Sequence, residues 1–325
     1  MTERFGMGHT SALQFERSYG YESEEAKRIK IGSKVVVAGL GGGGGMLAVM
    51  LAAEGYGNIS IIDGDRYDAS NWRVPYVGEN SIGQLKTDVT AEAILNKNPD
   101  VNLKVYSGRF DPDCAEDFML EGTKKNQIVV AIDEIDIKGS GPAAALHFAQ
   151  TARKLAIPVT SVTDIGKGGG TVTSYNPHSR YTYERVNGIR EGVTYDTYSA
   201  GELDLSGLAY LPPYGSIDTF QTVLGDDSVS VPAHPRSVLV ATGLGLSEVE
   251  RIVFDGKGMR YPKPTWAPRM RWVDVDGTNG STRFPRLSSK LHLGHAIIRD
   301  KLFRINPATS YSAEDIDRRK RDRGE

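Results

Sequence analysis

Patterns typical of buried strands alternate with helical patterns along the first half of the chain. Val35–Val37 is a short β-branched run, as expected of a parallel strand covered on both faces. Strand, helix and strand then succeed one another from residue 34 to 162, which predicts an α/β fold with a doubly wound, mainly parallel, Rossmann-like sheet. The predicted strands cover 59–63, 101–106, 127–132, 158–162 and 168–175, and the predicted helices cover 23–31, 46–53, 86–96, 111–120 and 142–157.

The pattern changes near Gly166–Gly170, and from Asn176 to about Pro235 prolines, glycines and tyrosines accumulate without a clear period. Helical periodicity returns at 237–253, an edge strand is predicted at 266–275, and a last helix at 287–303. The sequence therefore predicts an N-terminal helical arm (1–32), a Rossmann-like ATP-binding domain (33–175), an irregular crossover (176–236), C-terminal elements completing the same domain (237–310) and a charged tail (311–325).

A glycine-rich turn lies between the first strand and the first long helix. It contains G-x-G-x-x-G at Gly39, Gly41 and Gly44, with further glycines at 42, 43 and 45. Glycines allow a phosphate to approach the backbone, and the following helix start offers free N–H groups. Asp63 ends the next strand at the spacing usual for an acid that holds ribose hydroxyls. This arrangement predicts a nucleotide site; a strand–helix turn without a ligand would need fewer glycines.

Composition narrows the class of protein. The formal charge of −2 and the pI near 6.3 give no overall attraction to nucleic acid or to an anionic membrane. We find no apolar run of membrane-spanning length and no signal-peptide pattern, so we expect a cytoplasmic protein with no membrane partner. The single cysteine, Cys114, excludes an internal disulfide and a cysteine-only metal site.

Four charged residues stand at predicted strand ends or helix starts: Asp63, Arg73, Lys86 and Asp133. Ligands of open α/β sheets bind at the carboxyl ends of the strands, so Asp63 and Asp133 should face one crevice. A carboxylate beside a nucleotide can hold Mg²⁺, and cations can neutralise the charge that develops as a phosphorus–oxygen bond breaks. This combination fits ATP with Mg²⁺ better than NAD, and the P-loop motif is absent.

These motifs together resemble the ThiF/MoeB-type adenylating family, which includes the ubiquitin-activating enzymes. The resemblance covers roughly residues 15–256 and is carried by the glycine turn, Ile61–Asp65, Ser70–Arg73, Gly83–Lys86 and Ala131–Asp133. It implies a Rossmann-like, usually homodimeric enzyme that binds ATP and Mg²⁺. Such an enzyme transfers AMP to a carboxylate and releases pyrophosphate.

The resemblance also implies roles for individual residues. Asp63 would hold the ribose, Asp133 the Mg²⁺, and Asp65 would belong to the nucleotide site. Arg17 would reach the ATP of the partner subunit, although the surrounding sequence also fits a solvated arginine. The glycine cradle would be formed by Gly39, Gly41, Gly42 and Gly44, and the phosphates would be bound by Asn71, Arg73 and Lys86, with Arg73, Lys86 and Asp133 catalytic.

The chain departs from the family pattern at several points. Only Trp72 separates Asn71 from Arg73, where the family usually has two residues, and Val130 replaces a frequent aspartate. Arg180–Tyr183 stands where zinc-bearing members have C-x-x-C, so we expect no zinc. The departures at 71–73 leave open a nucleotide-binding pseudoenzyme that acts as a scaffold, and the glycine turn with Asp63 alone would also fit an NAD-dependent oxidoreductase.

The acyl substrate is not encoded in any motif. A small molecule, a peptide, a protein C-terminus or a modified tRNA nucleoside are all compatible, with tRNA disfavoured by the overall charge. Cys114 follows Asp111 and Asp113 and precedes Glu116 and Asp117, four carboxylates that should raise the pKa of its thiol. We therefore expect the acyl-adenylate to be used directly by an external or internal nucleophile, without a thioester.

Overall fold

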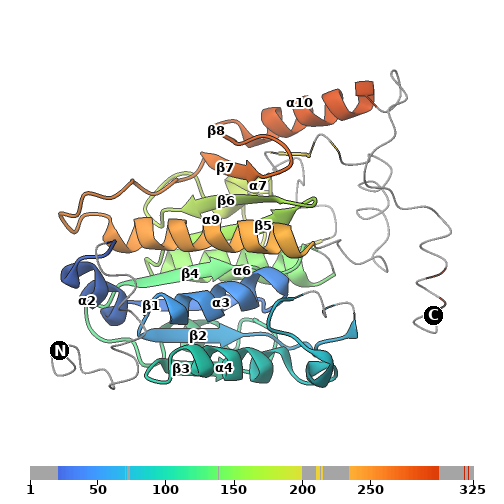
Figure 1. Cartoon of the computed structure of the whole chain (residues 1–325). Helices are drawn as coiled ribbons and strands as arrows, with labels where there is room; N and C mark the ends of the chain where they lie inside the picture. The colour runs from blue at the N-terminus through green and yellow to red at the C-terminus, as the bar shows by residue number, and fades with distance from the viewer. Residues whose placement is uncertain are drawn as a thin grey trace.

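The computed structural model describes residues 21–69, 71, 74–137, 139–199, 210–212, 214, 234–299, 318 and 321. Within these residues one mixed sheet of eight strands runs in the order β3-β2-β1-β4-β5-β6-β7-β8 (Figure 1). The first five strands in this order are mutually parallel, and β6, β7 and β8 each pair antiparallel to the neighbour before them. The strands are β1 (Lys34–Ala38), β2 (Asn58–Ile62), β3 (Asn102–Tyr106), β4 (Val129–Asp133), β5 (Val159–Ile165), β6 (Gly169–Tyr175), β7 (Met270–Asp274) and β8 (Gly280–Thr282).

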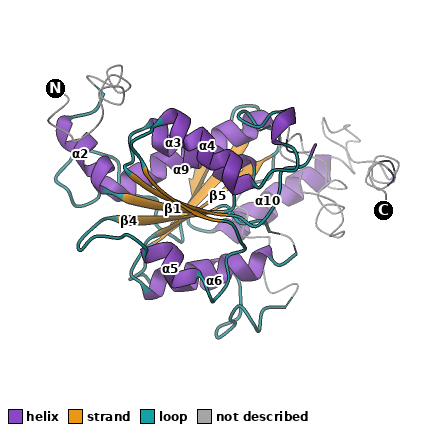
Figure 2. Cartoon of the chain, turned by 90° about the horizontal axis from the view of Figure 1, so that it is seen from below, coloured by secondary structure: helices purple, strands orange, loops and turns teal. Residues whose placement is uncertain are grey.

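Helices cover both faces of the sheet, as the doubly wound prediction required (Figure 2). One face carries α2 (Glu24–Gly32), α3 (Gly42–Ala53), α4 (Lys86–Lys97) and α9 (Pro235–Phe254), while the other carries α5 (Ala115–Leu120), α6 (Gly141–Lys154) and the short α7 (Tyr183–Asn187). Two further helical segments, η4 (Glu79–Ser81) and α10 (Pro285–Ile297), lie outside these layers.

The central strands are buried because their alternate side chains enter two different cores. Val35 and Val37 of β1 pack in the core under α3 and α9, whereas Val36 and Ala38 pack in the core under α5 and α6. All five residues of β1 are buried. This explains why the strand is apolar at four successive positions, Val35 to Ala38, rather than at every second one.

Four expected elements differ from the structure. The helix expected at 111–120 begins at Ala115, four residues later. The helix after the glycine turn begins at Gly42 rather than Met46, because the glycines themselves form its first turn. The strand at 266–275 is shorter, at Met270–Asp274, and β8 pairs with its outer side, so it does not form the edge. The last helix begins at Pro285, two residues earlier than expected. The domain boundaries and the arm at 1–32 stay predictions.

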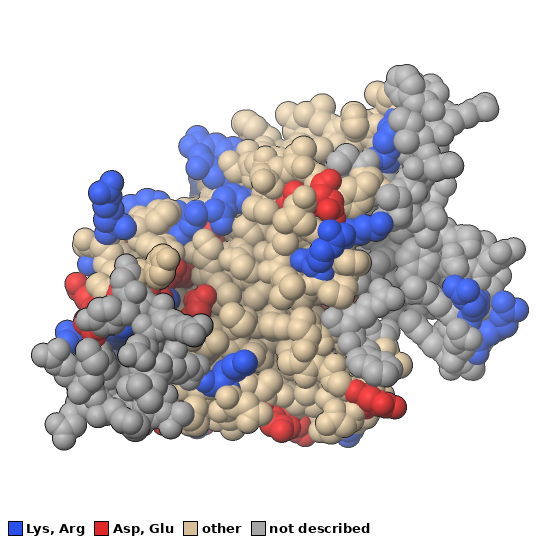
Figure 3. All heavy atoms as spheres, in the orientation of Figure 1, with Lys and Arg blue, Asp and Glu red and all other residues tan. Residues whose placement is uncertain are grey.

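On the face seen in Figure 3, much of the described surface carries no charged side chain, and several Lys and Arg side chains lie near one another toward the upper left. None of the described helices is both long and apolar enough to cross a membrane.

Candidate active site

A cavity of about 430 Å³ opens at the carboxyl ends of the parallel strands. It lies where the strand order reverses, because β1 is flanked by β2 on one side and β4 on the other. The segments that follow β1, β2, β3 and β4, and the end of β5, all contribute to its wall. A volume of this size is typical of a small-molecule site.

The glycine turn between β1 and α3 forms one wall of the cavity. Gly39, Gly41 and Gly42 line it, whereas Gly44 serves packing. A Cβ on Gly44 would lie 1.9 Å from the carbonyl oxygen of Gly39, and Gly39 itself has φ of +89°. The first turn of α3 contains no acidic residue. Its free N–H groups therefore present an anion site to the cavity.

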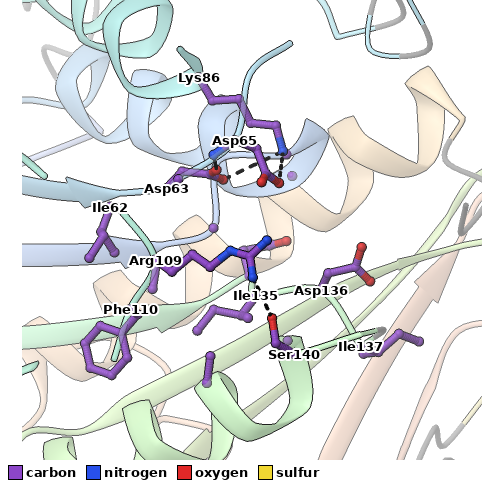
Figure 4. Close-up of a pocket in the computed structure, with 18 of the residues that line it drawn as sticks. Ile62, Asp63, Asp65, Lys86, Arg109, Phe110, Ile135, Asp136, Ile137 and Ser140 are labelled. Atoms are coloured by element: carbon purple, nitrogen blue, oxygen red, sulfur yellow. Dashed lines mark hydrogen bonds and ion pairs between the residues drawn. The ribbon is translucent and has the colours of Figure 1, made fainter. Parts of the chain in front are cut away.

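Asp63 and Lys86 lie together at the same wall (Figure 4). Asp63 is fixed because its Oδ2 accepts a hydrogen bond from Leu40 N at 2.7 Å and its Oδ1 accepts one from Asp65 N at 2.8 Å. The Lys86 Nζ lies 3.8 Å from Asp63 Oδ2 and 3.1 Å from Asp65 Oδ2. Burial alone would lower the pKa of Lys86, but the two carboxylates outweigh it and raise that pKa. Lys86 is therefore a permanent cation in the cavity.

Arg109 is a second cation at the cavity, and the sequence interpretation missed it. It stands three residues after β3 and donates from Nη1 to Ser140 Oγ at 3.3 Å, across the cavity mouth (Figure 4). Its neighbour Phe110 is buried against Phe118 and Phe148, which anchors the loop. The sequence contained a signal for Arg109, since the end of β3 should face the same crevice as the ends of β2 and β4.

Asp133 and Glu134 follow one another in the chain but face opposite sides of the sheet. Asp133 is buried, does not line the cavity, and accepts hydrogen bonds from Ser161 Oγ at 2.8 Å and Ile135 N at 3.3 Å. Burial raises the pKa of Asp133 to about 6, although these two hydrogen bonds lower it. Glu134 and Asp136 line the cavity instead.

Residues 16–212 match the ThiF family. This chain belongs to the ThiF family. It is 32% identical over 154 residues to the tRNA threonylcarbamoyladenosine dehydratase of Escherichia coli K12, covering 47% of this chain and 52% of that protein. It is 40% identical over 80 residues to the adenylyltransferase and sulfurtransferase UBA4 of Vanderwaltozyma polyspora, covering 24% of this chain and 18% of that one. The chain thus spans about half or less of these relatives.

Solved structures show the same ThiF fold. E. coli MccB with ATP matches with a TM-score of 0.57 at 17% identity, over 85% of this chain and 71% of that chain. PaaA matches with a TM-score of 0.55 at 18% identity, over 85% of this chain and 74% of that chain. The likeness confirms the predicted Rossmann-like architecture.

The other residues expected at the ThiF nucleotide site have different outcomes. Asn71 does not line the cavity, and its Oδ1 accepts a hydrogen bond from Asp68 N at 3.0 Å within its own turn. Arg17 and Arg73 lie outside the described residues, so their roles stay predictions. Asp65 lines the cavity together with Gly41.

A divalent cation would find hard oxygen ligands on one side of the cavity. Mg²⁺ is usually held by one or two carboxylates together with the phosphates of its nucleotide. Asp136 is exposed at the cavity wall and fits that role, whereas Asp133 is turned away. No group of three His, Cys, Asp or Glu within the described ranges is arranged to hold a metal by itself.

Cys114 precedes α5 and does not line the cavity. Its Sγ lies 3.6 Å from both the Arg109 and Asp111 carbonyl oxygens. The pKa of the thiol is raised, as the sequence predicted, although burial is a larger cause than the charge of Asp111.

Proposed function

We propose that this protein uses ATP to adenylate a carboxylate in the cavity and releases pyrophosphate. The observation that carries the proposal is the convergence of three features on one cavity: the N-terminus of α3, Asp63 and Lys86. An anion site, a fixed carboxylate and a permanent cation are what the phosphates and ribose of a nucleotide require. Membership of the ThiF family supports this chemistry over hydride transfer.

Each group has a distinct role in the proposed reaction. The glycine turn and the α3 N-terminus bind phosphate oxygens, and Asp63 accepts hydrogen bonds from the ribose hydroxyls with its remaining lone pairs. Lys86 stabilises the negative charge that grows on the α-phosphate as the substrate carboxylate attacks and pyrophosphate leaves. Arg109 lies close enough to the same cavity to assist with a second positive charge. Arg73 would join them if it follows the family pattern.

Bound Mg²⁺ would offset the charge of the β- and γ-phosphates. Asp136 is the candidate ligand that lines the cavity, and Asp133 stays the candidate predicted from sequence. Asp136→Asn and Asp133→Asn separate the two. Loss of ATP–pyrophosphate exchange in only one variant, with the fold retained by circular dichroism, identifies the ligand.

A peptide or protein carboxylate is the substrate class we propose, in a cytoplasmic homodimer. The tRNA alternative has support in the name that two of the relatives share, tRNA threonylcarbamoyladenosine dehydratase. The overall charge favours it less, because the chain has a formal net charge of −2, whereas RNA binding normally leaves a basic footprint. Retention of tRNA at low salt would reverse this order.

The test is ATP–pyrophosphate exchange with a panel of peptides and small carboxylic acids. We expect exchange by the wild type and its loss in Lys86→Met. Lys97→Met is the matched control, because Lys97 is exposed at the other end of the same helix. NADH binding by calorimetry, with no ATP binding and no exchange, would instead support an oxidoreductase. ATP binding without exchange for any acid would support a scaffold.

A further inference from the structure

The outer face of α10 is apolar. This helix lies beyond β7 and β8, at one edge of the molecule (Figure 1). Large apolar side chains that are exposed among the described residues gather here, whereas the others are spread over the rest of the described chain. The group consists of Phe284, Leu287, Leu291, Leu293, Ile297 and Ile298. Single exposed apolar residues are normal on a protein surface, but a contiguous group of them indicates an interaction site.

Contacts of the inner face fix the orientation of α10. Ser289 and Ala296 are buried, and His292 lies between them on the same side of the helix. The His292 ring packs edge-on against Tyr210 and against Trp272 of β7, with ring centroids 5.2 Å and 5.8 Å apart. The side of α10 toward the protein therefore carries polar and small residues, and the large apolar side chains are on the exposed side. A surface helix normally has the opposite arrangement.

The exposed apolar residues follow the spacing of a coiled-coil seam. In heptad notation Phe284, Leu291 and Ile298 occupy a positions and Leu287 occupies a d position. These are the two positions that contact a partner helix. The exposed fractions along this seam are 69% for Phe284, 57% for Leu287, 66% for Leu291 and 47% for Ile298. The remaining d position is Gly294, where a Cβ would meet no atom within 4 Å, so a large side chain of a partner has room there.

The charge beside the seam is positive. The sequence contains no Asp or Glu from residue 277 to residue 299. Lys290 is exposed at a g position, directly beside the seam, and Arg283 is exposed at the preceding g position. Residues at e and g positions determine the choice of partner in coiled coils through ion pairs between the helices. A partner helix therefore needs carboxylates at its own e or g positions.

Two other occupants fit this face less well. A second copy of α10 would bring the same cations and no carboxylate to the seam. A helix that lies on a membrane presents several Lys and Arg residues of its polar face to the lipid headgroups. The polar face of α10 is instead packed against β7, through His292 and Trp272. The charge of the seam thus favours a different, acidic polypeptide.

We propose that α10 is the docking site for an acidic amphipathic helix of another polypeptide. Apolar side chains of that helix pack on the seam, and its carboxylates lie opposite Lys290 and Arg283. The inference does not depend on the adenylation chemistry, because α10 does not line the cavity. The seam spans only two heptads, so the complex is a weak and reversible one, as is usual for small interfaces.

The test measures binding of two fluorescein-labelled peptides to the full chain by fluorescence anisotropy. Each peptide is a designed helix of three heptads with Leu at a and d and Ala at b, c and f. One has Glu at every e and g position, and the other has Lys there. We expect the Glu peptide to bind and the Lys peptide to bind about ten-fold or more weakly, because like charges would meet beside the seam. No binding of the Glu peptide, or equal binding of both, overturns the proposal.

Two variants assign the binding to α10. Leu291→Ser should weaken binding of the Glu peptide about ten-fold or more, because it removes an apolar contact from the centre of the seam. Leu239→Ser is the matched control and should bind as the wild type does, since Leu239 is 53% exposed on a different helix, α9. Lys290→Glu should reverse the preference between the two peptides, which tests the proposal even if Leu291→Ser does not fold. Unchanged affinity in Leu291→Ser, or unchanged preference in Lys290→Glu, overturns the proposal.

The other two occupants are tested with the same Leu291→Ser variant. If sedimentation velocity shows a dimer for the wild type and a monomer for the variant, α10 joins two copies of this chain and the proposal is wrong. If vesicles containing phosphatidylserine carry the wild type but not the variant in flotation, the face binds membranes and the proposal is also wrong. Equal oligomeric state and equal flotation of the two proteins support docking of a partner helix.

Discussion

The ammonium nitrogen of Lys86 lies 3.1 Å from Oδ2 of Asp65, two residues beyond the acid that we assign to the ribose. Asp65 is 60% exposed through its side chain, whereas that of Lys86 is only 13% exposed. The pair therefore orients Lys86 more than it stabilises the fold, since ion pairs with an exposed partner contribute little to folding.

This geometry predicts unequal effects of removing the two partners. Lys86→Met should lower pyrophosphate exchange about 100-fold or more, because it removes a charge that stabilises the transition state. Asp65→Asn should lower exchange about ten-fold or less, because Asp63 still holds the lysine. Steady-state exchange rates at saturating ATP measure both. A larger loss in Asp65→Asn than in Lys86→Met would contradict the assignment.

The buried Asp133 predicts a dependence of stability on pH. Its pKa is raised by burial from 3.8 to about 6. The folded state therefore holds this proton more tightly than the unfolded state, and the stabilisation is complete below pH 3.8 and is lost as the pH rises to 6. The shift corresponds to about 3 kcal/mol. Asp133→Asn should remove this pH dependence, so the variant should gain stability relative to the wild type between pH 4 and 7.

Urea unfolding of both proteins at several pH values measures that difference, and the wild-type curve corrects for all other titrating groups. A constant difference between the two proteins from pH 4 to 7 would show that Asp133 has an ordinary pKa. If Asp133→Asn folds stably but no longer catalyses ATP–pyrophosphate exchange, Asp133 has a role in binding the nucleotide or its Mg²⁺.

Two glycines of the turn should have different roles, one in folding and one in ligand binding. Gly44→Ala places a Cβ 1.9 Å from the Gly39 carbonyl oxygen, so it should destabilise the protein by about 3 kcal/mol or prevent folding. Gly41→Ala meets no atom within 4 Å, so it should fold normally. Because Gly41 lines the cavity, its variant should still weaken ATP binding. Thermal unfolding and calorimetric ATP titration test the pair, and a stable Gly44→Ala would refute the packing role.

The environment of Cys114 indicates that the reaction proceeds without a thioester intermediate. Its raised pKa leaves little thiolate at neutral pH, and the residue stands outside the cavity wall. Cys114→Ser should keep full exchange and transfer activity. Intact-mass spectrometry under non-reducing conditions should show no adduct on the wild type, whereas a thiol-sensitive adduct at Cys114 would contradict this prediction.

Hydrophobic patterning predicted the fold because each central strand is covered on both faces. Val35–Val37 could not be mistaken for a solvent-exposed strand, and glycine spacing located the turn at Gly39. The same reasoning brought Asp63 and Lys86 to one cavity correctly, since each lies directly at the end of its strand or the start of its helix.

The sequence was less informative where one residue decides which face a side chain enters. Asp133 is the last residue of β4 and points with Ala131 toward α6, so Glu134 and not Asp133 lines the cavity. Successive side chains of a strand face opposite sides of the sheet, so the side that Asp133 faces can be predicted only when the last residue of the strand is known. The predicted strand ended at residue 132, one residue before the observed end. Arg109 was missed because it stands three residues beyond β3 rather than directly at the strand end.

The position of α9 has a consequence for the order in which the protein can fold during synthesis. Val249, Val253 and Ala241 of this late helix complete the same core as Val35 and Ile61, and α9 packs along α3, β5 and β6. A ribosome has therefore finished six strands before the helix that covers them emerges. The nascent chain must keep that apolar face from aggregating for at least 60 residues of elongation, since Tyr175 ends β6 and Pro235 begins α9. The segment that matches the ThiF family ends at residue 212, so it should not form a stable protein when expressed alone.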